Sequence, residues 1–113
     1  MKVLNISKNI SLGERIGLAN TFASRFFGLM LKRTLSEGEG LIIKPCNSIH
    51  MFFMRLSIDV IFIDRNNTVV YLLEGIAPWK VSKVVWNSSF VIELPEGTIN
   101  RTRTEIGDKI EII

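Results

Sequence analysis

Apolar residues occur along the chain in short runs, most of which alternate with polar residues and end in clusters of turn-forming residues. Runs of this length, rich in β-branched and aromatic residues, predict β-strands. The clearest case is VIFIDRNNTVVYLL, which predicts a hairpin because Asn66 and Asn67 tolerate the backbone of a tight turn. The other predicted strands are 2–6, 14–19, 41–45, 48–54, 90–94 and 107–113.

The period changes once, in TFASRFFGLMLKR (21–33), where apolar residues recur at spacings of three and four. This spacing predicts a helix of about three turns. Thr21 suits its N-cap, and Lys32 and Arg33 suit the C-terminal end of the helix dipole. We therefore expect a mainly β (α+β) fold, a small antiparallel jelly-roll-like sandwich or barrel with one attached α-helix, in a single domain over residues 1–113.

Composition and charge narrow the class of protein. Of the 113 residues, 47% are hydrophobic and 22% charged, which is typical of globular chains. The net charge of +3 comes from Lys and Arg residues spread along the chain, which argues against a nucleic-acid-binding protein. The apolar runs are far shorter than the roughly 20 residues of a membrane-spanning helix, and the N-terminus lacks the apolar stretch of a secretory signal. We expect a cytoplasmic protein, monomeric or weakly dimeric, without a membrane partner.

The single cysteine and the single histidine, Cys46 and His50, lie four residues apart in PCNSIHMFFM. A thiolate beside an imidazole is a nucleophile, so a small hydrolase or thiol enzyme is one alternative. In a strand, however, positions four apart are separated by about 13 Å, too far for a hydrogen bond. One cysteine and one histidine are also too few for an ordinary zinc site. We expect no catalytic residue, no metal and no cofactor, with Cys46 an inert, buried side chain.

Five residues are candidates for contact with a ligand: Arg25, Ser48, His50, Asp59 and Trp79. His50, on the same predicted strand face as Ser48, has apolar neighbours on both faces and should be at least half buried in a concave apolar site. Asp59 precedes the run VIFI, where an ionised carboxylate needs a partner. We expect Arg25 or His50 to be that partner and to tie the helix to the sheet. Trp79, in APWKVSK, suits stacking on a ligand or partner, or else covering the core.

Four motifs occur in a fixed order: RFFGLM, SIHMFFMRLSIDVIFID, ELPEGT and a late GD. Together they resemble the DUF192 family of small bacterial and archaeal proteins, whose biochemical role is not established. The resemblance spans about Ala19 to Ile113 and implies a compact, mainly β domain with an attached helix. Many members read Phe-Trp-Met-Lys-Asn-Thr where this chain reads MFFMRLS, and many carry an export signal. The chain is more similar to the cytoplasmic branch, which has Cys and His just before the Phe-Met pair.

No glycine-rich phosphate loop, recognisable pair of catalytic carboxylates or Ser-His-Asp signature occurs in the sequence. We therefore favour a non-enzymatic module that binds a small molecule or a partner in a pocket near the helix and the central strands. Two alternatives stay open. One is the thiol enzyme using Cys46 and His50, and the other is an assembly scaffold that docks a protein through a strand edge or the Trp79 loop.

Overall fold

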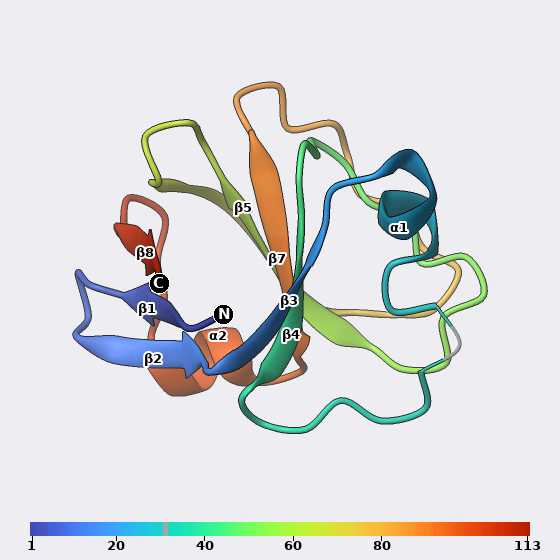
Figure 1. The fold of residues 1–113 in the computed structure, drawn as a ribbon, viewed down its shortest axis with the longest axis horizontal. Helices are drawn as coiled ribbons and strands as arrows, with labels where there is room; N and C mark the ends of the chain where they lie inside the picture. The colour runs from blue at the N-terminus through green and yellow to red at the C-terminus, as the bar shows by residue number, and fades with distance from the viewer. Residues whose placement is uncertain (31) are drawn as a thin grey trace.

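The computed structural model describes residues 1–30 and 32–113. Figure 1 shows the three-stranded sheet and the second helix at one end of the molecule and the first helix at the other. The mainly β, α+β fold class is confirmed. In chain order the elements are β1 (Val3–Asn5), β2 (Ile10–Gly13), β3 (Arg15–Ala19), α1 (Phe22–Phe27), β4 (Glu39–Ile43), β5 (Ile58–Ile63), β6 (Val69–Ile76), β7 (Phe90–Pro95), α2 (Thr98–Thr102) and β8 (Ile110–Ile112).

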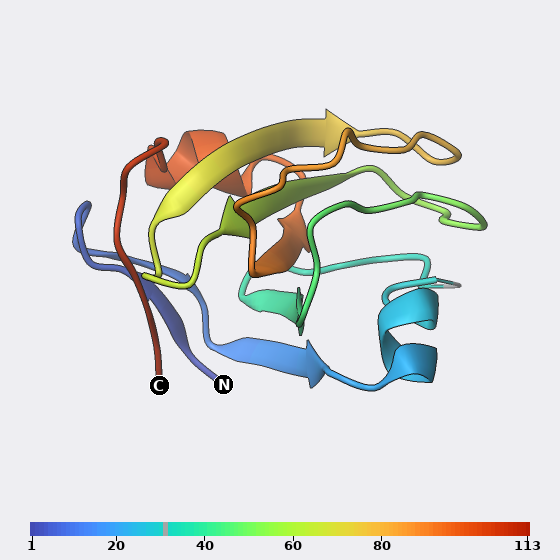
Figure 2. The same cartoon turned by 90° about the horizontal axis from the view of Figure 1, so that it is seen from above.

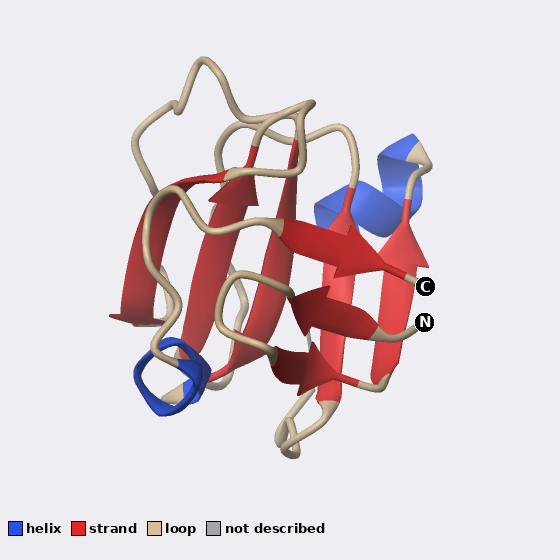
Figure 3. Ribbon diagram, turned by 90° about the vertical axis from the view of Figure 1, so that its left-hand side faces the viewer, coloured by secondary structure: helices blue, strands red, loops and turns tan. Residues whose placement is uncertain are grey.

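The strands form two sheets, with the orders β2-β1-β8 and β3-β4-β7-β5-β6. Figure 3 shows the three short strands lying across the longer strands of the second sheet. Figure 2 shows the two edge strands of that second sheet, β6 in yellow and β3 in blue, at opposite ends of the strand order. All paired strands are antiparallel except β3 and β4. This parallel pair departs from the expected antiparallel sheet because the connection through α1 carries the chain back to the same starting end.

The five-stranded sheet buries a separate apolar core on each face. Along β7, Ile92 and Leu94 belong to the core between the two sheets, whereas Val91 belongs to the core on the opposite face. The segments 45–54 and 77–89 contribute buried residues to that second core. Since side chains alternate along a strand, neighbouring residues of β7 face two different environments.

Residues 48–54 do not form the predicted strand. They form an irregular loop that pairs with a second loop: Met51 N donates to Lys80 O and Trp79 N donates to Met51 O, each over 2.7 Å. Phe53 has a φ of 62°, which turns the chain out of an extended path. The strand prediction is wrong because the backbone partners of this loop lie some thirty residues away, where no local pattern reveals them.

Helix α1 is shorter than the three turns predicted. Thr21 is its N-cap, as expected, with its hydroxyl accepting a hydrogen bond of 3.1 Å from Ser24 N. Gly28 ends the helix with a φ of 48°, a conformation that glycine adopts without the strain a side chain brings. Residues 29–33 of the predicted helix include Leu31, which lies outside the described residues.

Two elements, β2 and α2, were not predicted from the sequence. Helix α2 follows the predicted Pro-Glu-Gly turn and is five residues long. Its amide at Ile99 donates a hydrogen bond of 2.8 Å to the Asp59 carboxylate. A helix of this length has too little periodicity to be recognised and depends on tertiary contacts for its stability.

Candidate functional site

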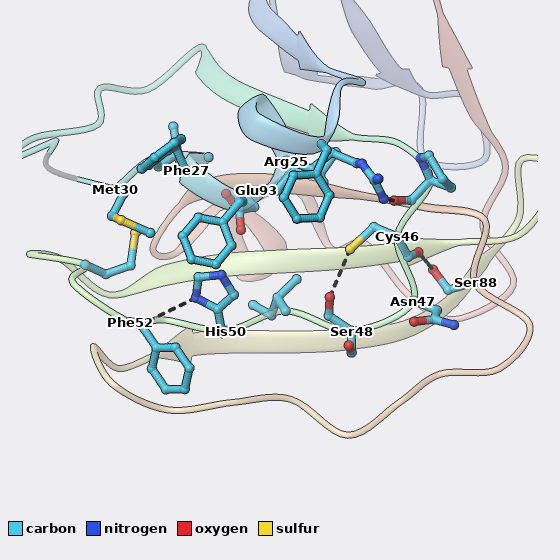
Figure 4. A pocket seen from close by; sticks show the side chains of 18 residues that line it. Arg25, Phe27, Met30, Cys46, Asn47, Ser48, His50, Phe52, Ser88 and Glu93 are labelled. Atoms are coloured by element: carbon cyan, nitrogen blue, oxygen red, sulfur yellow. Dashed lines mark hydrogen bonds between the residues drawn. The ribbon is translucent and has the colours of Figure 1, made fainter.

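A pocket of about 460 Å³ lies beneath α1, between the helix and the segment 45–54. Its walls come from α1 and the turn after it, from residues 45–50, and from Ile43 and Glu93 of the five-stranded sheet. Figure 4 shows the Glu93 carboxyl between α1 and His50 in this view, with Cys46 and Ser48 on the other side of the pocket. The volume falls within the range of pockets that hold small organic molecules.

Glu93 is the buried acid of this pocket. It lies on β7 opposite Leu41 of β4 and Val60 of β5, so it occupies an inner strand of the sheet. The residue is only 5% exposed, and burial raises its pKa to about 8, with no hydrogen bond from a described residue opposing the shift. Glu93 is therefore mostly a neutral carboxylic acid at pH 7, with one O–H donor and one carbonyl acceptor facing the pocket.

Gly28 brings the end of α1 close to this acid. A methyl group on the Cα of Gly28 would lie 3.6 Å from Glu93 Oε1. The amide of Gly28 donates a hydrogen bond to Ser24 O. Because the φ of Gly28 is positive, a larger residue there would be strained as well as close to the carboxyl. The glycine thus both ends the helix and keeps the approach to Glu93 open.

His50 lines the pocket and is partly buried, in agreement with the sequence-based expectation. Its Nδ1 accepts a hydrogen bond of 3.3 Å from Phe52 N, which leaves the proton of a neutral ring on Nε2. The ring lies 5.3 Å from that of Phe26 and 5.0 Å from that of Phe52, centroid to centroid. We call the three rings of Phe26, His50 and Phe52, all of which line the pocket, the aromatic wall.

Cys46 and Ser48 lie on the opposite wall. The Cys46 thiol donates to Ser48 O over 3.0 Å, and burial is the main reason that its pKa is raised. A raised pKa keeps the thiol protonated and makes it a poor nucleophile at neutral pH. Cys46 and His50 both line the pocket, so the distance expected from strand spacing does not separate them. Each nevertheless hydrogen-bonds to the backbone of segment 45–54, through Ser48 O and Phe52 N.

Arg25 lines the pocket from α1. Its Nη1 donates to Pro45 O over 3.1 Å, and its Nε is buried without a hydrogen-bond partner among the described residues. The ion pairs found in residues 1–30 and 32–113 do not include Arg25. Its contact with the carbonyl joins the helix to the loop and leaves one uncompensated positive charge in the pocket wall.

Asp59 does not pair with Arg25 or His50, and that prediction is wrong. Its carboxylate, fully buried, accepts hydrogen bonds from Gly75 N at 2.9 Å and Ile99 N at 2.8 Å. Two backbone amides satisfy the buried charge in place of a cationic side chain. Asp59 also lies outside the pocket lining, because its side chain points to the other face of the sheet.

Trp79 does not line the pocket but adjoins it through two phenylalanines. Its ring centroid lies 6.1 Å from that of Phe52, a pocket residue, and 4.9 Å from that of Phe53. Trp79 and Phe53 are 59% and 58% exposed, and both have positive φ angles. We call Phe52, Phe53 and Trp79 the aromatic shelf. Positive φ is uncommon for bulky residues, so the shelf presents its rings at some cost in backbone strain.

Three of the five residues that the sequence suggested come together in the structure. Arg25, Ser48 and His50 line one pocket, Trp79 lies beside it and Asp59 lies elsewhere. Glu93 was missed, although a single acidic residue inside the apolar strand FVIEL was a signal for it. Within the described part of the chain no three His, Cys, Asp or Glu side chains are grouped closely enough to hold a metal ion.

Comparisons with known proteins place the chain in a family. The DUF192 family model, described as "Uncharacterized ACR", matches residues 4–112. A UPF0127 protein of Pyrococcus abyssi is 37% identical over 117 residues, covering 98% of this chain and 97% of the relative. A UPF0127 protein of Thermococcus sibiricus is also 37% identical, covering 96% of this chain and 73% of the relative.

Two crystal structures have closely similar folds, each with a TM-score of 0.85. One is a Novosphingobium aromaticivorans protein of unknown function, 25% identical and covering 98% of this chain and 82% of that protein. The other is a putative transcription regulator of Sinorhizobium meliloti. It is 23% identical, the match covers 97% of this chain and 89% of that protein, and the likeness concerns the fold alone.

The helices in the described residues include none long and apolar enough to cross a membrane. By its near full-length match to the family model and its close archaeal relatives, the chain belongs to the DUF192 family.

Proposed function

We propose that this protein is a non-enzymatic binding module that holds a small organic molecule in the pocket beneath α1. The size of the pocket supports this function, as does its lining of apolar and aromatic side chains with a few polar groups. The aromatic shelf extends the apolar surface beyond the pocket rim. A ligand would place its apolar body against these rings and a polar group against Glu93.

Glu93 is the single observation that carries the proposal. A buried carboxyl group without a hydrogen bond lowers the stability of a protein, and most buried polar groups are therefore paired. No partner for Glu93 occurs among the described residues, and its carboxyl opens into the pocket. A ligand that hydrogen-bonds to the Glu93 carboxyl would satisfy a polar group that has no partner among the described residues.

The thiol-enzyme alternative receives less support from the same pocket. A nucleophilic cysteine needs a depressed pKa and a base in contact with it. Burial instead raises the pKa of Cys46, and its thiol bonds to a backbone carbonyl. The scaffold alternative rests on the exposed Trp79 and Phe53, which also suit the outer part of a small-molecule site.

A fragment screen by two-dimensional NMR tests the proposal. Uniformly ¹⁵N-labelled protein is titrated with a library of small aromatic and aliphatic polar fragments. We expect hits whose shift changes concentrate on the amides of Gly28, Ile49 and Glu93, which line the pocket. At ten times its Kd, each hit should stabilise the fold by about 1.4 kcal/mol.

Matched aromatic variants provide the control. Phe26→Ala removes a ring from the pocket wall, whereas Trp86→Ala removes an 84% exposed ring that does not line this pocket. Hits should weaken at least fivefold in Phe26→Ala and stay unchanged in Trp86→Ala. Absence of any hit, or hits mapping to α2 and the three-stranded sheet, would overturn the proposal.

A further inference from the structure

Building on the proposed binding function, we propose that the ligand class is an uncharged planar amide or lactam, which pairs edge-on with the carboxyl of Glu93 and lies flat against the aromatic wall. Three features of the pocket lead to this class: the pairing pattern of the acid, the shape of its surroundings and the charge of the wall.

The acid determines the pairing pattern. Glu93 is held on an inner strand between β4 and β5, and its surroundings keep it mostly protonated at neutral pH. A carboxylic acid presents an O–H donor beside a C=O acceptor in one plane. The complementary edge is an N–H beside a C=O, as in a primary amide or a ring lactam. Such a pair makes two parallel hydrogen bonds and leaves neither oxygen of Glu93 unsatisfied.

The aromatic wall determines the shape of the ligand. Phe26 and His50 approach to 5.3 Å between centroids with their planes 47° apart, and Phe52 stacks on His50 at 27°. These rings offer flat apolar faces that suit offset stacking with a planar ligand. Because the Nδ1 atom of His50 is occupied by Phe52 N, the imidazole contributes its face and its Nε2–H.

Arg25 argues against a cationic ligand. Its guanidinium already brings one positive charge to the pocket wall and donates a hydrogen bond to a neutral carbonyl, that of Pro45. An ammonium group would be repelled by Arg25 and would offer no acceptor to the O–H of protonated Glu93. A carboxylate ligand would accept from the O–H of Glu93 but would place its second oxygen against the carbonyl oxygen of the same group. An amide avoids both conflicts.

Three probes of similar size test the class: benzamide, benzylamine and benzoate. Each is titrated by NMR at pH 6.5 into the wild type, Glu93→Gln and Glu93→Leu, with the amide spectrum verifying that each variant is folded. We expect benzamide to bind with a Kd on the order of 1 mM, as suits a ligand of this size. The other two probes should bind at least tenfold more weakly.

The two Glu93 variants separate pairing from charge. Glutamine keeps a donor beside an acceptor, so benzamide affinity in Glu93→Gln should stay within about threefold of the wild type after the amide rotates to match. Leucine removes both groups, and Glu93→Leu should bind benzamide at least tenfold more weakly. Preference for benzylamine, with loss of binding in Glu93→Gln, would overturn the inference and leave the binding function intact.

The pH dependence gives a second readout. Only the protonated acid can pair with the amide, so benzamide affinity should fall about tenfold between pH 7 and pH 9 in the wild type. The other ionisable groups lining the pocket are Arg25, Cys46 and His50. The fall should persist in Cys46→Ser and His50→Gln and disappear in Glu93→Gln. Binding of none of the three probes, or an affinity independent of pH, would overturn the amide class, whereas the fragment screen decides the binding function separately.

Discussion

Glu93 and Asp59 are buried acids of adjacent strands that point to opposite faces of the same sheet. Glu93 pairs with Val60, and Asp59 pairs with Leu94, so the two carboxyls are offset by one register position. A one-residue offset reverses the face of a side chain. Asp59 therefore accepts hydrogen bonds from Ile99 N of α2 and Gly75 N of β6, whereas Glu93 reaches the pocket beneath α1.

Glu93→Gln should make the protein more stable at high pH. The folded-state pKa of Glu93, about 8, lies above its ordinary value of 4.5, so the protonated form of this group favours folding. The protonated carboxyl contributes its full share of the free energy of unfolding below pH 4.5, and this contribution is lost as the pH rises to about 8. Glutamine does not ionise, so the variant should gain about 3 to 5 kcal/mol over the wild type at pH 9.

Urea unfolding followed by circular dichroism at pH 4.5, 7 and 9 measures this difference. The advantage of Glu93→Gln over the wild type should be near zero at pH 4.5 and should grow towards pH 9. A difference that does not depend on pH would show that the carboxyl ionises as readily in the folded protein as in the unfolded chain.

Asp59→Asn should destabilise the protein by about 2 to 4 kcal/mol at pH 7. Asparagine retains one acceptor, but its amide group would face one of the two backbone N–H donors, of Gly75 or Ile99. Urea unfolding provides the free energy. Ser48→Ala, a change at an exposed site, is the control and should cost less than about 0.5 kcal/mol.

A double-mutant cycle tests the corrected partner of Asp59. Because Arg25 bonds to Pro45 O and not to Asp59, Arg25→Met and Asp59→Asn should be additive to within about 0.5 kcal/mol. A coupling free energy well above 1 kcal/mol between the two substitutions would restore the ion pair that the sequence suggested.

Cys46 should react slowly with iodoacetamide at pH 7. Burial raises the pKa of its thiol, so the reactive thiolate is scarce. We expect alkylation, followed by intact mass, to be at least tenfold slower in the folded protein than in urea, and to accelerate with rising pH. A reaction faster than in urea at pH 7 would indicate an activated thiol and revive the enzyme alternative.

Phe53→Gly should change the free energy of unfolding by less than about 1 kcal/mol. The substitution removes a mostly exposed ring but relieves the strain of a φ of 62°. Urea unfolding measures the effect, and Met51→Gly, at a fully buried position, should cost several times more. A loss above about 2 kcal/mol in Phe53→Gly would mean that the aromatic shelf supports the fold.

Much of the fold could be predicted because its signals are local. The hairpin of β5 and β6 follows from two apolar runs around a turn-forming segment, and the start of α1 follows from Thr21 as an N-cap. Strand propensity, turn residues and capping act within a few residues, so the sequence alone determines them. The same local signals indicated that His50 would be partly buried among apolar neighbours.

Tertiary structure alone decided the site. Residues 48–54 have strand-like composition, yet they form a loop because their backbone partners lie in the loop around Lys80. The roles of Asp59 and Glu93 likewise depend on which face of the sheet each one points to. That face is set by register with strands distant in sequence, and a shift of one residue would exchange the two environments. Local pattern therefore indicated one buried acid, Asp59, whereas packing determined that a different acid, Glu93, faces the pocket.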